Sequence, residues 1–455
     1  MLKQSSDLMH AWSNSRKAGT ECAMAVESLL KRIVDERMSG NMEAIAATED
    51  YNCLLEGWAR SGAGVAGAER CEQILTEMEE RFKQGDSLIQ PNLQSFKAVL
   101  MAWKQSGASF AAVRAQRVLE WMVRLAAEGE NEQVLPDGDS FDIVLQIWSR
   151  SGLPDAPEKT EQLLTAMERL YLATNLDRVR PRTSSFNAVL AAWSKSGAKG
   201  STKRATDILE FMERRADEGW PGPDEASYTT VVTALLKSKS SNSAQQSEAF
   251  LQNAEDILGP DNAPDTIFYN MVIGAQARSN NSGAYRRARS ILDRQVKKYE
   301  EGCRKCKPDV YGFTSVIAAA SMEPANIKER NKAFHAALAA FQQLSKYDNP
   351  THVTYGTMLK ACARLLPNND RLRHRWGKRI FRQAVEDGCV GDMVVSRMRE
   401  AVSPPIYRDL MKGNKKQNLP EQWTRNVEEK NEYRNKKFLQ GNTSNQKKNG
   451  RRAEV

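Results

Sequence analysis

The feature that most constrains the fold of this chain is a sequence that it repeats. Four near-copies follow one another as YNCLLEGWARSG, SFKAVLMAWKQSG, SFDIVLQIWSRSG and SFNAVLAAWSKSG. Their tryptophans lie 45 residues apart, at Trp58, Trp103, Trp148 and Trp193. A fixed period of about 20 to 50 residues is typical of repeat architectures, in which each unit packs on its neighbours. We therefore expect one stacked array in these 455 residues rather than several globular domains.

The first half of each unit has the pattern of an amphipathic helix. In the first copy, Tyr51, Leu54, Leu55 and Trp58 follow the i, i+3, i+4, i+7 spacing that places apolar side chains on one helix face. In five units a serine or threonine directly before the aromatic residue can accept backbone N–H groups at the helix entry, and a glycine such as Gly62 suits the helix exit. These residues are Ser95, Ser140, Ser185, Ser227 and Thr354. Later units repeat the pattern at spacings of 42, 41, 44 and 42, with aromatic residues at Tyr228, Tyr269, Phe313 and Tyr355.

A second helix and a proline connector complete each unit. In the first unit the second helix carries an apolar stripe of Cys71, Ile74, Leu75 and Met78. Connectors then end in proline and a polar residue, because proline stops a helix and presets a turn. The pattern predicts an all-α fold, a right-handed α-solenoid of stacked antiparallel helix pairs.

The repeats divide the chain into three regions. We expect a partial N-terminal repeat over residues 1–47, then about eight helix pairs with a C-terminal capping helix over residues 48–402. Residues 403–455 hold 13 Lys and Arg against 6 Asp and Glu and few apolar side chains, which predicts a disordered basic tail.

The N-terminus opens inside a repeat, since Trp12 lies 46 residues before Trp58. No Arg- and Ser-rich, acid-poor presequence is visible, so either the protein lacks one or this sequence begins late. No apolar run approaches the about 18 residues that a membrane span needs, and we expect no membrane association. The seven cysteines have no regular spacing, which favours a reducing compartment over a disulfide framework.

Positive charge is concentrated near the C-terminus. Residues 1–351 carry a net charge of −3, whereas residues 352–455 carry +12. Sequence-independent binding to phosphates depends on Lys and Arg that displace counterions. The first three quarters of the chain must therefore bind nucleic acid weakly in this mode, or select it through other contacts.

Three segments resemble the pentatricopeptide repeat: YNCLLEGWARSG, IFYNMVIGAQARS and VTYGTMLKACARL. Each contains the aromatic residue at which its first helix pattern starts, the first two have Asn directly after it, and the units continue into a second helix ending near Met and then Pro-Asp. The resemblance covers about residues 1–402, although these units of 41 to 45 residues are longer than the family's usual unit. Tetratricopeptide repeats also stack helix pairs, but no unit here carries their W-x2-L-G-x2-Y motif.

The resemblance implies single-stranded RNA lying along the first helices, with one base read per repeat by two or three side chains. The family reads a base with the residue directly after the aromatic and with the residue four before the next aromatic. Carried over, the pairs are Asn52 with Asn92, Lys97 with Asp137, Asp142 with Arg182, Asn187 with Asp224, Thr229 with Asp265, Asn270 with Asp309, Thr314 with Thr351 and Gly356 with Asp392.

The family's correspondence assigns bases to some of these pairs. Asn with Asp favours U, Thr with Asp favours G, and Asn with Asn favours a pyrimidine. The fourth to sixth units would then read U-G-U, with the RNA running 5′ to 3′ along the chain. Lys97, Asp142, Arg182 and Gly356 fit no common pair, and their units are expected to act as spacers.

The residue two before each aromatic clamps a base in the family. Ile267, Tyr311 and Val353 can stack on a base, whereas the first units carry the polar residues Glu49 and Gln94 at this position. A structural interpretation competes at the reading positions, because Asp after Pro commonly caps a helix and Asn in a first turn needs no ligand. Both interpretations remain open from the sequence.

The densest basic cluster of the repeats is RLRHRWGKR, which spans Arg371 to Arg379. We expect Arg371, Arg373 and Arg375 to contact the RNA backbone, with a solvated helix face as the alternative. Cys303-x-x-Cys306 could form half of a zinc site, but no second Cys or His pair follows at suitable spacing. The deaminase signature and other catalytic constellations are absent, so we expect no enzyme, no cofactor and no metal.

These observations predict a protein that binds single-stranded RNA sequence-selectively. By its resemblance we expect a monomer that acts in an organelle, mitochondrion or chloroplast, in RNA processing, stability or translation, together with other RNA-processing proteins. The alternative is a protein-binding scaffold without RNA contact, which the nearly neutral repeats and polar clamp positions favour.

Overall fold

The computed structural model describes residues 19–41, 44–129, 131–238, 240, 242–258, 263–279, 281–323, 327–368, 370–414, 416 and 418–427. These residues form helices joined by short turns, without an extended strand among them, which confirms the predicted all-α repeat fold. The chain divides into two compact units, Met1–Ala234 and Leu235–Val455, and each is described by itself. The predicted position of Trp12 lies outside the described residues.

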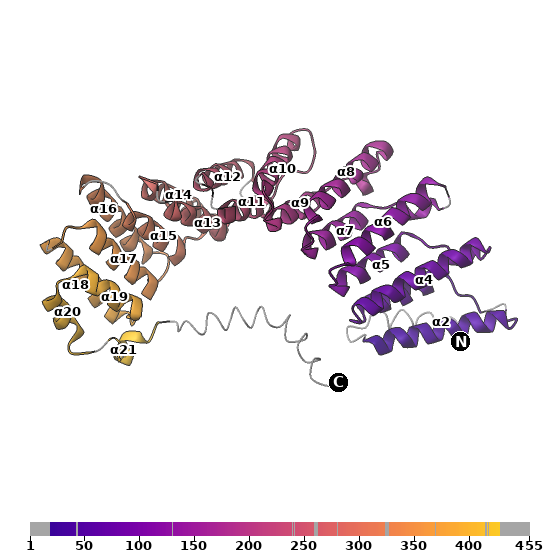
Figure 1. Cartoon of the computed structure of the whole chain (residues 1–455), viewed down its shortest axis with the longest axis horizontal. Helices are drawn as coiled ribbons and strands as arrows, with labels where there is room; N and C mark the ends of the chain where they lie inside the picture. The colour runs from indigo at the N-terminus through magenta and orange to yellow at the C-terminus, as the bar shows by residue number, and fades with distance from the viewer. Residues whose placement is uncertain are drawn as a thin grey trace. The chain divides into compact units, whose positions relative to one another are not determined.

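The first unit is built from helix pairs packed in two layers (Figure 1). The first helices α3, α5, α7 and α9 contact one another in sequence, and each packs on its own second helix, α4, α6, α8 or α10. A single second helix, α2, precedes them and packs on α3. The bounds are α2 Thr20–Met38, α3 Thr48–Arg60, α4 Val65–Lys83, α5 Leu93–Ser106, α6 Ala111–Ala127, α7 Gly138–Ser151, α8 Ala156–Thr174, α9 Thr183–Ser196 and α10 Ser201–Ala216.

The second unit repeats this architecture. The first helices α13, α15 and α17 pack side by side and pair with α14, α16 and α18, and α19 continues the first-helix layer beyond α17. Helix α11, Glu225–Ser238, contains the boundary between the units. The bounds are α12 Ser243–Ile257, α13 Thr266–Arg278, α14 Ala284–Glu300, α15 Val310–Ser321, α16 Ile327–Leu344, α17 His352–Leu365, α18 Arg371–Glu386, α19 Asp392–Ala401, α20 Pro404–Met411 and α21 Glu421–Thr424.

The repeated tryptophans belong to the core, as the helical pattern predicts. Trp103 and Trp148 are buried, and Trp58 and Trp193 are half-buried. In three units the indole N–H donates to a glutamate of the preceding second helix, which ties neighbouring pairs together. The Trp Nε1 to Glu Oε distances are 2.8 Å for Trp58 to Glu27, 2.9 Å for Trp103 to Glu72 and 3.2 Å for Trp193 to Glu161.

Glycine ends the first helices where the sequence predicts it. Gly107, Gly152 and Gly197 adopt the left-handed conformation, with φ of 62°, 69° and 63°. L-residues with a Cβ rarely adopt this conformation, which explains why glycine recurs there.

Helix entries differ from the expectation in one respect. The serine or threonine before each aromatic is not the N-cap but the third residue of the helix, as Ser95 is in α5. The N-cap is the residue three earlier, Asn92, whose side-chain oxygen accepts from the backbone N–H of Gln94 and Ser95. The Ser95 hydroxyl accepts from the Asn92 backbone N–H in return, at 3.2 Å.

Connectors between units contain short 3₁₀ turns, which the sequence pattern did not predict. The last residue of each turn is buried: Ile89, Val134, Val179 and Cys306. Cys306 thus takes the place of an apolar residue and forms a disulfide with Cys303. This pairing differs from the expectation of reduced cysteines, and it follows from the three-residue turn that brings both side chains together.

The ordered chain continues past residue 402, the boundary expected from the sequence. Helix α20 follows α19 directly, and the segment around α21 returns to the last connector. The Val390 N–H donates to the Trp423 carbonyl at 2.8 Å, the Asn426 N–H donates to the Gly388 carbonyl at 2.9 Å, and the Trp423 ring packs edge-on against Phe381. The predicted disordered tail can therefore begin only after Val427, and the residues beyond it lie outside the described part.

Candidate nucleic-acid interface

The predicted base-reading residues meet across neighbouring repeats in a recurring arrangement. We call this arrangement a rung: it contains the residue directly after an aromatic (the reader), the N-cap of the next first helix, and the third residue of that helix. In the Asn187 rung, Asn187 Nδ2 donates to Asp224 Oδ1 at 3.0 Å. The Ser227 hydroxyl donates to Asn187 Oδ1 at 2.6 Å. Each end of the reader amide thus has a partner from the next repeat.

The same arrangement occurs in an earlier repeat of the first unit, in the Asn52 rung. Asn52 Nδ2 donates to Asn92 Oδ1 at 3.3 Å, and the Ser95 hydroxyl donates to Asn52 Oδ1 at 2.6 Å. Asn52 is only 3% exposed, whereas the reader Asn187 is half-buried. The Asn52 amide is therefore less accessible to a ligand than the Asn187 amide.

The second unit contains two further rungs. Asn270 Nδ2 donates to Asp309 Oδ1 at 2.9 Å, as in the Asn187 rung. Thr314 Oγ1 lies 2.8 Å from Thr354 Oγ1, so this rung joins its reader to the third helix residue through two hydroxyls. The predicted pair Asn270 and Asp309 is thus in direct contact, whereas Thr314 is linked to its predicted partner Thr351 only through Thr354, at 3.2 Å from Thr351 Oγ1.

Two predicted pairs are placed differently. Gly356 has no side chain to join Asp392, and the Met393 side chain lies directly over it. Thr229 belongs to the first unit and Asp265 to the second, so their geometry is described separately. Asp265 is the N-cap of α13 and accepts from the Phe268 N–H at 2.8 Å.

The N-cap members of the rungs also have the structural role that competes with base reading. Asp224 Oδ1 accepts from the Ser227 N–H at 2.9 Å, and Asp309 Oδ1 accepts from the N–H groups of Tyr311 and Gly312. Within the described residues, the hydrogen bonds of these two carboxylates all use the same oxygen, Oδ1. Capping and reading are therefore compatible, because Oδ2 of each carboxylate is left for a ligand.

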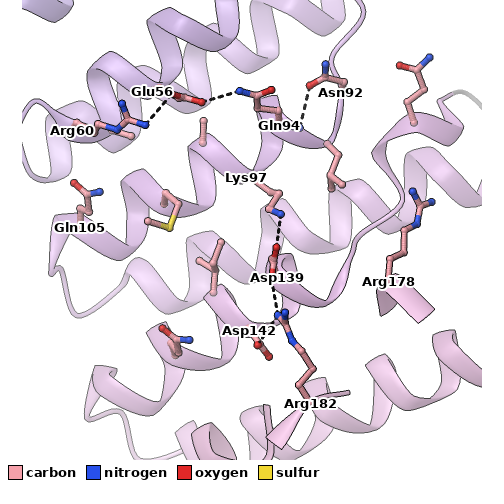
Figure 2. A pocket seen from close by; sticks show the side chains of 17 residues that line it. Glu56, Arg60, Asn92, Gln94, Lys97, Gln105, Asp139, Asp142, Arg178 and Arg182 are labelled. Carbon is pink, nitrogen blue, oxygen red and sulfur yellow. Dashed lines mark hydrogen bonds and ion pairs between the residues drawn. The ribbon is translucent and has the colours of Figure 1, made fainter. Parts of the chain in front are cut away.

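A charged network replaces amide readers in the second and third rungs (Figure 2). Lys97 Nζ lies 2.9 Å from both Asp137 Oδ2 and Asp139 Oδ2. Arg182 Nη2 lies 2.6 Å from Asp139 Oδ1 and 2.9 Å from Asp142 Oδ2. The two cations thus share three carboxylates, so neither cation is left free for a ligand and one negative charge is in excess.

The network shifts the titration of its members. Hydrogen bonds from Lys97 and then Arg182 hold the pKa of Asp139 below its ordinary value. Burial alone would lower the pKa of Lys97, but the hydrogen bonds to Asp139 and Asp137 outweigh it and raise that pKa. Asp139 and Lys97 are therefore both charged at neutral pH, and the ion pair between them persists there.

This network lines a groove of about 1000 Å³ along the first-helix layer of the first unit. Figure 2 shows Glu56 between Arg60 and Gln94 at one side, and Asp139 between Lys97 and Arg182 at the other. The groove also contains apolar side chains, Met101 and Ile143, and the exposed cation Arg178. Its wall is mixed in charge rather than uniformly positive.

The three predicted clamp residues are exposed although they are large and apolar. Ile267 is 64% exposed, Tyr311 60% and Val353 41%. All three lie in the first turns of first helices in the second unit, α13, α15 and α17, beside the helix entries that carry the rungs. Exposed apolar side chains at successive repeats provide surfaces on which a planar group can stack.

The predicted basic cluster is only partly available to a ligand. Arg373 is 8% exposed and donates to the carbonyls of Leu366, Glu400 and Ala401, so the prediction that it contacts RNA is wrong. It instead satisfies carbonyls at the C-terminal ends of α17 and α19, and burial lowers its pKa. Arg371 and Arg375 are exposed. They lie at the start of α18, the end of the hairpin away from the α17 entry.

Sequence reasoning missed the hydroxyls that join the readers to the next repeat. Ser95, Ser227 and Thr354 were assigned to helix entry alone, yet each also contacts a reader. The available signal was their fixed place, three residues after the N-cap and directly before the aromatic, in units whose reader is Asn or Thr.

The described residues contain no group of three or more His, Cys, Asp or Glu side chains placed to hold a metal ion. None of the described helices combines the length and apolarity that crossing a membrane requires.

No family model matches the chain, and no curated protein is significantly similar to it. Two solved structures similar to the chain are of the pentatricopeptide repeat protein PPR10 in complex with an 18-nt psaJ RNA element, one of them carrying three cysteine-to-serine substitutions. Each matches with 15% identity and a TM-score of 0.32, over 88% of this chain and 59% of that one. This chain thus spans a little over half of their length.

Because this likeness is distant, the class of the protein follows from its own repeats and helix pairs. The chain is an all-α helical-repeat protein, with an aromatic-led first helix, a second helix and a proline connector in its units.

Proposed function

We propose that this protein binds single-stranded RNA along its first-helix layer and reads bases at its rungs. The observation that carries the proposal is the recurrence of one amide geometry at Asn52, Asn187 and Asn270, in register with the repeats. A reader amide offers both a donor and an acceptor. Uracil presents a carbonyl acceptor beside an N–H donor, which an amide can match.

The exposed clamp side chains support the same proposal. Ile267, Tyr311 and Val353 flank the entries of successive first helices in the second unit. Stacking of a base on such a side chain stabilises binding by about 1–3 kcal/mol without selecting a sequence. Stacking would therefore supply affinity, and the rungs Asn270–Asp309 and Thr314–Thr351 would supply selectivity.

We further propose that the fourth to sixth rungs select U-G-U, through Asn187 with Asp224, Thr229 with Asp265 and Asn270 with Asp309. The family resemblance also supports action in an organelle, mitochondrion or chloroplast. There the protein would act in RNA processing, stability or translation by occupying a transcript. Other RNA-processing proteins would then carry out any chemistry on that transcript.

Selection of RNA from a random pool on the purified protein tests this function. We expect enrichment of sequences with a U-G-U core, and a loss of enrichment at the last U alone for Asn270→Ala. Asn175→Ala serves as a matched surface control, because Asn175 ends α8 and belongs to no rung. A pool that shows no enriched motif with the wild-type protein would contradict the proposal.

A protein-binding scaffold is the second candidate, and one observation favours it. In the groove of the first unit, Lys97 and Arg182 are already paired with carboxylates, so the groove has little free positive charge for phosphates. A mixed wall with apolar patches suits a peptide. The same purified protein then yields no selected RNA motif but retains a peptide partner, and this partner is released by charge reversal at Lys97.

A further inference from the structure

We infer that, where the third residue of a first helix carries a hydroxyl bonded to the reader of the preceding repeat, this hydroxyl positions the reader and thereby sets base selectivity. The inference rests on the proposed RNA-binding function and adds a residue that does not touch the base. Ser227 is the example in the first unit, and Gly312 is the exception in the second.

Ser227 gives the Asn187 amide one orientation. Its hydroxyl has a single hydrogen, and the shortest contact, 2.6 Å to Asn187 Oδ1, takes it. Asp224 Oδ1 accepts from Asn187 Nδ2 at 3.0 Å. A flipped amide would place its oxygen against the Asp224 carboxylate oxygen, so the two partners together specify which end of the amide donates.

The orientation determines what the rung offers to a base. After these two bonds, Asn187 has one amide N–H and one lone pair of Oδ1 without a partner among the described residues. Because the amide is held in place, this N–H and this lone pair have fixed directions. A base with an acceptor beside a donor can therefore pair with them in one orientation only. Without the hydroxyl, the amide is held at one end and can rotate to meet other bases.

Gly312 shows what happens where the hydroxyl is missing. It stands at the third position of α15, where Ser95, Ser185, Ser227 and Thr354 stand in other first helices. Asn270 Oδ1 is buried there and has no hydrogen-bond partner. A Cβ built on Gly312 would lie 2.7 Å from that oxygen, so Asn270 occupies the space that the serine side chain takes elsewhere.

In the Asn270 rung, the reader amide therefore has a hydrogen bond to Asp309 alone, at 2.9 Å, and its oxygen lies close to Gly312 of α15. The neighbours beyond the missing side chain are Leu292 and Ile273, at ordinary contact distances of 3.6 and 3.7 Å. A serine at position 312 can fit only if Asn270 moves outward, and its hydroxyl would then reach the unpaired oxygen. The chain thus contains one strict and one relaxed version of the same Asn–Asp rung.

The test exchanges the two versions and measures selectivity at single base positions. In competition binding with RNAs that differ only at the base opposite Asn187, Ser227→Ala should reduce the preference about fivefold, the equivalent of one hydrogen bond of about 1 kcal/mol. Ser227→Thr, which keeps the hydroxyl, should restore it. Gly312→Ser should raise the preference at the base opposite Asn270 by a similar factor.

Ser140→Ala is the matched control for helix stability. The Ser140 hydroxyl donates to its own N-cap, Asp137, at 2.8 Å, but within the described part of the chain no hydrogen bond joins it to the reader Lys97. Its loss should lower the unfolding midpoint about as much as Ser227→Ala does, while leaving every base preference unchanged. Equal effects of both substitutions on base preference would overturn the inference.

The outcomes separate this inference from the proposed function. A wild-type protein without any base preference at these positions would overturn the proposed function and the inference together. A wild-type preference that survives unchanged in Ser227→Ala would overturn the inference alone. A readout without RNA is the side-chain amide signal of Asn187 in nuclear magnetic resonance, which should shift and broaden in Ser227→Ala and stay sharp in Ser227→Thr.

Discussion

At the scale of single residues, side chains of neighbouring repeats meet at the rungs, and Arg373 joins the ends of two helices. The reader and N-cap pairs could be predicted from their spacing to the aromatic, and those at Asn52, Asn187 and Asn270 do meet. The role of Arg373 could not be predicted. Its burial depends on the carbonyl ends of α17 and α19 converging on one point, which no local pattern records.

Arg373 should matter for stability rather than for RNA. Arg373→Ala leaves the carbonyls of Leu366, Glu400 and Ala401 without their donor in a buried place. We expect the free energy of unfolding to fall by about 2–3 kcal/mol, as for other buried charge-assisted hydrogen bonds. Denaturant unfolding measures the loss.

The neighbouring exposed Arg375 supplies the control for that measurement. Arg375→Ala should change the free energy of unfolding by no more than about 0.5 kcal/mol, as exposed substitutions usually do. If the two substitutions had equal effects on stability, or if Arg373→Ala weakened RNA binding without destabilising the protein, the structural assignment of Arg373 would be wrong.

At the scale of helices, periodicity predicts the pairs well because a buried stripe needs the same spacing wherever it occurs. The ties between pairs are less visible in sequence. Trp58, Trp103 and Trp193 each donate to a glutamate, but Trp148 Nε1 is buried and unpaired. The corresponding position on α6 holds Gln116, whose Oε1 is also buried and unpaired.

Gln116→Glu should therefore restore the missing tie between α6 and α7. The added carboxylate can accept from the Trp148 N–H, as Glu72 does from Trp103 at 2.9 Å. We expect the free energy of unfolding to rise by about 1 kcal/mol, the net contribution of one hydrogen bond. The midpoint of urea unfolding, followed by tryptophan fluorescence, measures it.

A control for this substitution is Arg124→Gln, which lowers the net charge by the same one unit on the same helix but lies at an exposed position away from Gln116 and from Glu120, which Gln116 contacts. An unchanged or lower midpoint for Gln116→Glu would show that a carboxylate at position 116 forms no stabilising hydrogen bond with the Trp148 N–H. The four tryptophan positions would then not be structurally equivalent.

At the scale of the whole chain, charge and repeat signals lie in different regions. The repeats up to residue 351 carry −3, and the remainder carries +12. The sequence predicted where the array is and where the charge is. It did not predict helices α20 and α21, or that the segment around α21 meets the last connector, because that packing depends on Trp423 reaching Phe381 from far along the chain.

The separation of charge predicts that affinity and selectivity can be separated. Truncation after Val427 removes eight Lys and Arg against four Asp and Glu. It should weaken binding of all RNAs by a similar factor and reduce the dependence of binding on salt, because fewer counterions are released. Binding isotherms at several salt concentrations, with matched and mismatched RNAs, test this; a change in base preference would contradict it.

A rung with an Asn or Thr reader should read one base, and recoding one such rung tests this most directly. Asn187→Thr turns the Asn–Asp pair of the fourth rung into the Thr–Asp pair that the family resemblance associates with G. Selection of RNA on this variant and on the wild-type protein should give G-G-U in place of U-G-U, with the other two bases unchanged. The same motif from both proteins, or a general loss of selection at all three bases, would contradict the account.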